Sequence, residues 1–249
     1  MQYSHLSETV TIKKVKVEGN YGIFQIEGLY TGYGVTLGNA LRRTLLSSLP
    51  GAAITQIKIK GVNHEFSTLP GMMEDVVAFT LNLKKVRFQF FADEPQVLSL
   101  KIKGEKEVTA SDIESTTFVQ VINKDLHLAS LTKKIAELDM ELTVEKGLGY
   151  VPTEARKLER LTVGTIMLDA IFSPVVKMDF KVENMRVGEL TNFNKLTLEI
   201  ETDGSINPES ALHKASNILK DHFDKIAMAT ESEVKVEPTE EEKTKKKKK

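Results

Sequence analysis

Three glycines, at positions 32, 34 and 38, stand directly before a helical segment and are the first residues that could perform chemistry, by cradling a phosphate. The dinucleotide fingerprint requires G-x-G-x-x-G, and here the third glycine comes one position late. The P-loop pattern is also absent from the chain. The glycines are therefore interpreted as a turn that starts a helix.

The sequence also does not support a metal site or a nucleophilic active site. The five histidines, at positions 5, 64, 127, 213 and 222, are scattered, and the two that share a predicted helix are nine residues apart and face opposite sides. The chain has no cysteine, which excludes thiolate zinc sites and cysteine nucleophiles, and it has no G-x-S-x-G elbow. No catalytic, metal or cofactor site is predicted on this chain, which favours a binding or structural role.

The charge distribution argues against a protein that mainly binds nucleic acid. Residues 231–249 carry six acidic and seven lysine side chains, which leaves 27 basic and 29 acidic residues in positions 1–230. Phosphate binding usually requires a basic excess, and this body has none. The segment 231–249 has few large apolar residues and is predicted to be a disordered charged tail. No secretory signal or membrane-spanning run is evident, so a cytoplasmic location and no membrane contact are expected.

A helix predicted over residues 34–49 has two different faces. One face is an apolar stripe that includes Leu37, Leu41 and Leu45, and Pro50-Gly51 ends the helix. The other face carries Asn39, Arg42, Arg43 and Leu46. It is either a solvated surface or a binding interface, because arginine beside exposed leucine is typical of interface cores.

A second long helix is predicted from Asn207-Pro208 to about Met228. Its apolar stripe is wider than one underlying sheet needs, which indicates self-association, although packing into a single core remains an alternative. A hairpin turning at Gly19-Asn20, a helix over 72–83, a short charged helix over 153–160 and several segments of strict apolar and polar alternation complete the prediction. The predicted class is α+β with antiparallel sheets.

Several motifs resemble the alpha subunits of bacterial-type RNA polymerase. The match starts with TGYGVTLGNALRRTLLSSLPG at 31–51 and continues, in the family's order, through GMMED at 71–75, LNLK at 81–84, GLGYV at 147–151, DAIFSPV at 169–175 and EIETDG at 199–204. The resemblance implies two subdomains. A dimerisation subdomain of helices on an antiparallel sheet would comprise 1–50 plus 176–230, and an inserted mixed α/β subdomain would comprise 51–175.

The resemblance also implies a non-catalytic assembly subunit that forms a homodimer and recruits the beta and beta-prime subunits. Magnesium and zinc are expected only on those partner subunits, and contact with DNA is expected only through the assembled polymerase. The residues implied are, for the dimer interface, Leu37, Leu41, Leu45, Ala215, Ile218, Leu219 and Phe223; for beta, Asn39, Arg42 and Arg43; and for beta-prime, Lys84, Phe172, Ser173 and Pro174.

The chain departs from the family's usual plan, since a carboxy-terminal DNA-binding domain is expected after a linker and the sequence has only the charged tail. Two other interpretations remain open. One is a homodimeric enzyme that holds an acidic or phosphorylated ligand with Arg42 and Arg43, and the other is a DNA-binding regulator, which the slightly acidic body disfavours.

Overall fold

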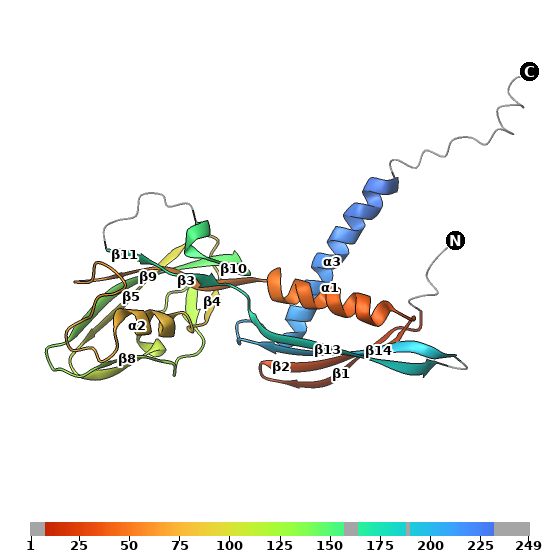
Figure 1. Ribbon diagram of the computed structural model, residues 1–249, viewed down its shortest axis with the longest axis horizontal. Helices are drawn as coiled ribbons and strands as arrows, with labels where there is room; N and C mark the ends of the chain where they lie inside the picture. Colours follow the sequence, from red (N-terminus) through yellow and green to blue (C-terminus); the bar gives the residue numbers. More distant parts are fainter. Residues whose placement is uncertain (1–7, 157–163, 188–189, 232–249) are drawn as a thin grey trace, which may run out of the picture.

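The protein is described by a computed structural model that covers residues 8–156, 164–187 and 190–231. Two bodies lie side by side along the long axis, and helix α3 (Pro208–Glu231) projects from one of them (Figure 1). All the strand pairs among the described residues are antiparallel, and the predicted α+β class is confirmed.

The first body, which we call the sheet–helix unit, is built from both ends of the described chain. Its sheet has the order β1-β2-β14-β13, with β1 at Thr11–Glu18, β2 at Tyr21–Leu29, β13 at Val175–Val187 and β14 at Leu190–Thr202. Helices α1 (Tyr33–Ser47) and α3 (Pro208–Glu231) pack on one face of the sheet. The core that they enclose comprises Phe24, Ile26, Leu29, Leu41, Leu45, Leu49, Val175, Met178, Leu196, Leu198, Ile200, Ala211 and Ala215.

The second body, which we call the inserted unit, lies between α1 and β13 in the sequence. Its main sheet has the order β11-β3-β9-β5, with β11 at Thr165–Met167, β3 at Pro50–Ile59, β9 at Glu137–Leu148 and β5 at Gln96–Lys103. Three two-stranded sheets accompany it: β4 (Phe88–Phe90) with β7 (Val119–Val121), β6 (Lys106–Thr109) with β8 (His127–Leu131), and β10 (Tyr150–Val151) with β12 (Ala170–Ile171).

Helix α2 (Val76–Leu83) supplies the middle of the inserted unit's core. Val76, Phe79 and Leu83 recur at the spacing of one helical face, and all three are fully buried. The helix starts at Asp75, whose carboxylate accepts a hydrogen bond from the Ala78 backbone N–H at 2.6 Å. The core of this unit runs from Ile54 to Leu168, so the two cores share no residue.

Several predicted elements are confirmed, and others need correction. The hairpin at Gly19-Asn20 and the two long helices form as expected, with α1 over 33–47. The helix predicted over 72–83 begins only at Val76, because Asp75 caps it. The helix predicted at 153–160 is a 3₁₀ turn over Thr153–Ala155, and positions 157–160 lie outside the described residues. Glu231, assigned to the tail, is the last described residue of α3, while 232–249 lie outside the described residues.

Candidate functional site

The outer face of α1 carries an unpaired positive charge. Asn39, Arg42 and Arg43 are all exposed, and the Asn39 side chain donates back to the Val35 carbonyl at 3.1 Å. Neither guanidinium forms an ion pair or hydrogen bond within the part of the chain that the structure describes. No Asp or Glu occurs anywhere between Glu27 and Glu65 in the sequence. The outer face of α1 therefore presents two guanidinium groups without an acidic residue nearby in the sequence, and their donors are available to an acidic or carbonyl-bearing partner.

The inner face of α1 is already used within one protomer. Leu41 is buried, and Leu45 is 0% exposed in the single chain. Ala215 on α3 is likewise 0% exposed. These three residues belong to the protomer's own core, so the prediction that they form a dimer interface is corrected, since they have almost no surface left for a second copy.

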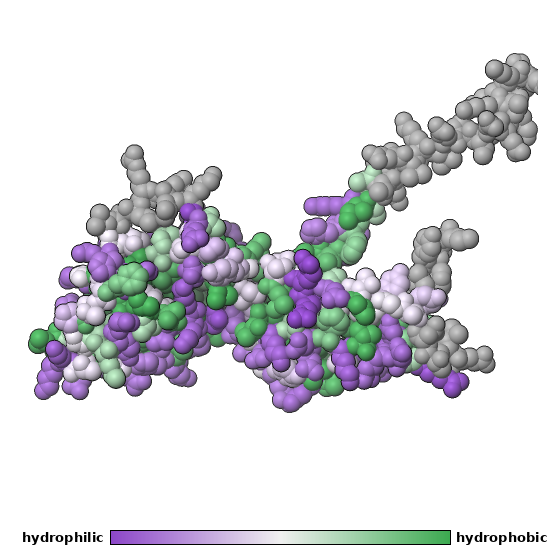
Figure 2. All heavy atoms as spheres, viewed as in Figure 1, coloured by the Kyte–Doolittle hydropathy of each residue, from purple (hydrophilic) through white to green (hydrophobic). Residues whose placement is uncertain are grey.

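The other predicted dimer residues keep some accessible surface. Leu37, Ile218 and Leu219 are half-buried against the sheet–helix core, and Phe223 is 62% exposed. Every residue of α3 from Lys220 to Ala229 is exposed, including Ile226 and Met228. This distal part of α3 projects beyond the body and carries hydrophobic surface (Figure 2). A projecting helix with large apolar side chains is typical of an interaction surface.

Lys84, one of the residues predicted to contact beta-prime, pairs with Asp169, which lies three positions before Phe172 in the sequence. Lys84 Nζ lies 3.1 Å from Asp169 Oδ2, and Asp169 Oδ1 accepts the Thr153 backbone N–H at 3.0 Å. The hydrogen bond from Thr153 and the Lys84 ammonium together hold the pKa of the Asp169 carboxyl below its ordinary value. Asp169 is thus an ionised anchor for Lys84, a role that the sequence analysis did not assign although the residue opens one of its motifs.

Phe172 and Pro174 are less suited to a subunit contact than predicted. Phe172 is buried in a small cluster with Ala53 and Ala170, and the Arg156 guanidinium lies 5.9 Å from the centre of its ring. Pro174 is also buried, while Ser173 is half-buried and its hydroxyl donates to the Val175 carbonyl at 3.1 Å. The prediction is corrected for Phe172 and Pro174, because their side chains hold the protomer together and offer little free surface.

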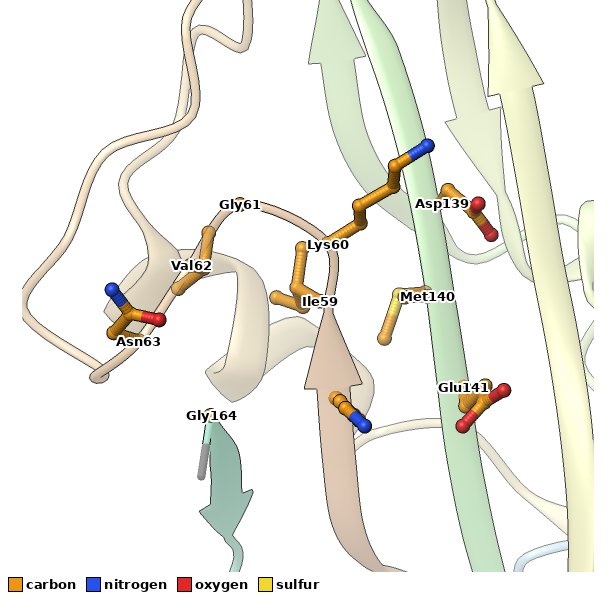
Figure 3. A pocket seen from close by; sticks show the side chains of 10 residues that line it. Ile59, Lys60, Gly61, Val62, Asn63, Asp139, Met140, Glu141 and Gly164 are labelled. Carbon is orange, nitrogen blue, oxygen red and sulfur yellow. The ribbon is translucent and has the colours of Figure 1, made fainter. Parts of the chain in front are cut away.

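The cavities give no support to an anion site at Arg42 and Arg43. One cavity of about 280 Å³ lies at the end of β3, and its lining includes Lys58, Lys60 and, from β9, Asp139 and Glu141. Figure 3 shows Lys60, Asp139 and Glu141 around this cavity. Neither arginine lines this cavity or the cleft between the two units that is described below. Among the described residues, no group of three or more His, Asp or Glu side chains could hold a metal ion. Nor is any described helix long and apolar enough to cross a membrane.

Comparisons with known proteins decide the family. Residues 57–173 match the family described as "RNA polymerase Rpb3/RpoA insert domain". The chain is 48% identical over 230 residues to a DNA-directed RNA polymerase subunit alpha of Symbiobacterium thermophilum, which covers 92% of this chain and 72% of the relative. It belongs to the bacterial RNA polymerase alpha subunits.

Other relatives agree on this membership. The chain is 47% identical over 243 residues to the alpha subunit of Carboxydothermus hydrogenoformans, with 94% of this chain and 77% of the relative covered. It is 47% identical over 232 residues to that of Desulforudis audaxviator, with 92% and 73% covered. The matched insert segment falls almost entirely within the inserted unit, which runs from β3 to β12. The resemblance to this family predicted from the motifs is therefore confirmed.

Proposed function

We propose that this alpha-family chain acts as a homodimeric scaffold that recruits the beta and beta-prime subunits for transcription and has no active site of its own. The observation that carries the proposal is the pair of unsatisfied surfaces on the two long helices. Helix α3 has an exposed apolar end, and α1 has a positive outer face without a counter-charge.

The dimer part of the proposal rests on the distal half of α3. Phe223 and Ile226 are separated by three positions and therefore lie on neighbouring parts of one helical face, and both are well exposed. Leaving such side chains in water costs free energy that a second copy of the same helix would recover. Leu37, Ile218 and Leu219 are half-buried and would border this contact, which replaces the buried leucine stripe as the basis of the dimer.

The beta part of the proposal rests on Asn39, Arg42 and Arg43. An arginine can fork onto a carboxylate or onto backbone carbonyls of a partner with two parallel hydrogen bonds. Arg43 is the residue that we propose as the main beta contact. For beta-prime we propose the surface around Lys84, which is half-buried and oriented by Asp169.

We further propose that this chain contributes no magnesium or zinc ligands, and that those ions and the DNA are held by the partner subunits. The polymerase that it joins would act in the cytoplasm.

Co-purification with the beta subunit tests the beta contact. Arg43→Ala is expected to leave the chain folded and dimeric but to reduce recovery of beta at least tenfold, because the partner's acceptors lose their donor. Lys101→Ala is the matched control, since Lys101 is an exposed cation on β5 of the inserted unit. Normal recovery of beta with Arg43→Ala would remove the proposed role of this arginine.

A further inference from the structure

The chain crosses between the two units at two places that lie against each other. The first crossing follows α1 at Leu49 and Pro50, and the second leads from Phe172 into β13. At this point a Cβ added to Gly51 would lie 1.8 Å from the Phe172 carbonyl oxygen, and one added to Gly147 would lie 2.6 Å from the Phe172 ring. The backbones of the two crossings therefore pack closely against each other. These crossings are the segments about which one unit would turn relative to the other.

Away from the crossings the units are not joined by a continuous core. A cleft of about 340 Å³ separates them, with Ser205, Ile206 and Lys214 on the sheet–helix side and Phe88, Phe90 and Lys146 on the inserted side. Since the cores share no residue, the relative orientation of the units has to be set by individual contacts at the junction.

One such contact is an ion pair between Arg87 of the inserted unit and Asp203 of the sheet–helix unit. Arg87 Nε lies 3.9 Å from Asp203 Oδ2, and the two side chains are only 24% and 10% exposed. This partial burial protects the pair from screening by salt. Arg87 follows α2, whereas Asp203 follows β14, so the pair connects one unit directly to the other.

Both ends of this ion pair are held in place by their own neighbours. The Arg87 backbone N–H donates to Asn123 Oδ1 at 2.8 Å, and the Asn123 amide donates to the Lys85 carbonyl at 2.9 Å. Asp203 donates its backbone N–H to the Pro174 carbonyl at 3.0 Å, and its Oδ1 accepts the Ser205 N–H at 2.9 Å. These hydrogen bonds hold the Arg87 backbone and the Asp203 carboxylate in place independently of the ion pair, which reduces the conformational entropy lost when the pair forms.

The residue after Asp203 leaves little space for a side chain between the two units. Gly204 has a φ of +92°, and a Cβ placed on it would lie 3.2 Å from Asn20 Nδ2 of the sheet–helix unit and 3.3 Å from Ile122 Cγ2 of the inserted unit. A side chain at this position would require the Asn20 and Ile122 side chains to shift by a few tenths of an ångström, and it would also be strained by the positive φ. Glycine at position 204 thus permits a close approach of the two units beside the ion pair.

We propose that the Arg87–Asp203 ion pair, beside the close approach of Gly204 to Ile122, forms a latch that fixes the orientation of the inserted unit on the sheet–helix unit. When the latch is closed, the two crossings cannot act as a hinge. When it is open, the inserted unit turns about them. The latch is independent of the proposed dimer and beta contacts, because none of its residues lies on the outer face of α1 or on distal α3.

Electron–electron distance measurements test this proposal in the full chain. The sequence has no cysteine, so Thr11→Cys on β1 and Lys101→Cys on β5 provide one label on each unit. Doubly labelled chains are diluted into an excess of unlabelled chain so that distances within one protomer are measured. A single narrow distance distribution is expected with the latch intact. Arg87→Asp or Asp203→Arg is expected to broaden it at least twofold, and the double exchange is expected to restore it.

Two further variants separate the latch from simple loss of folding. Lys103→Ala removes an ion pair to Glu137 that lies wholly inside the inserted unit, and it should leave the distribution narrow. Arg87→Gln keeps the size of the side chain and removes its charge, so it tests the latch if Arg87→Asp does not fold. A distribution that stays narrow in Arg87→Gln and Asp203→Arg, with unchanged circular dichroism, would overturn the proposal.

Discussion

Truncation of Phe223 is the sharpest test of the proposed dimer. Full burial of a phenylalanine side chain is worth about 2.5 kcal/mol relative to full exposure. Phe223 is 62% exposed in the single chain, so a partner that covers it recovers about 1.5 kcal/mol. A two-fold dimer contains this contact twice, which gives about 3 kcal/mol. Since about 1.4 kcal/mol corresponds to a tenfold change, Phe223→Ala should raise the dimer Kd roughly 150-fold.

Sedimentation equilibrium over a range of chain concentrations measures this Kd. Phe66→Ala is the matched control, because Phe66 is 78% exposed but belongs to the inserted unit, and it should leave the Kd unchanged. Circular dichroism should be the same for both variants, since neither residue is part of a core. A Kd for Phe223→Ala within threefold of the control would refute the assignment of distal α3 to the dimer contact.

Two further predictions concern stability. Leu45→Ala removes a fully buried side chain and should lower the free energy of unfolding of the sheet–helix unit by about 2 to 5 kcal/mol, as measured by urea titration. The control is Leu46→Ala, which should lower this free energy less because Leu46 is only half-buried. Equal losses in the two variants would contradict the placement of Leu45 in the core. Burial raises the pKa of Glu74, but hydrogen bonds from the Ser130 backbone N–H and from His127 outweigh it, so the pKa lies below its ordinary value of 4.5. The contribution of Glu74 to the free energy of unfolding is therefore fully present above about pH 4.5 and is lost as the pH falls through the lowered pKa of Glu74. In Glu74→Gln, the midpoint of urea unfolding should depend less on pH below about pH 4.5 than it does in the parent chain. An unchanged dependence of the midpoint on pH would exclude the proposed contribution of Glu74 to stability.

Local patterns predicted the elements better than they predicted what each element packs against. The spacing of Leu37, Leu41 and Leu45 identified α1 within two residues at its carboxyl end, because one apolar stripe is enough to specify a helix. The same spacing could not say whether the stripe faces the chain's own sheet or a second copy. The exposure of the single chain distinguishes the two cases and leaves distal α3 as the apolar surface without a core beneath it.

Interactions between distant segments had no signal in the sequence. Nothing near Arg87 or Asp203 indicates that they meet, since their contact depends on how two separately folded units are oriented. Asp75 shows a different limit, because an aspartate before an apolar run is a normal cap, and the helical spacing of the preceding Met73 concealed where the helix starts. Motif order was more informative than periodicity, and it alone pointed to the family that the comparisons confirmed.

The pairing of β2 with β14 has a consequence for how the protein is made. During synthesis the inserted unit can complete its core once Leu168 has emerged from the ribosome, because every buried member of that core lies between Ile54 and Leu168. The sheet–helix unit must wait, since Phe24 packs with Leu196, Leu198 and Ala215, which emerge last. Until then α1 has its apolar face uncovered. A prematurely terminated chain therefore folds one unit and leaves the other open to proteases and chaperones, so that only finished chains have a sheet–helix unit with which to assemble.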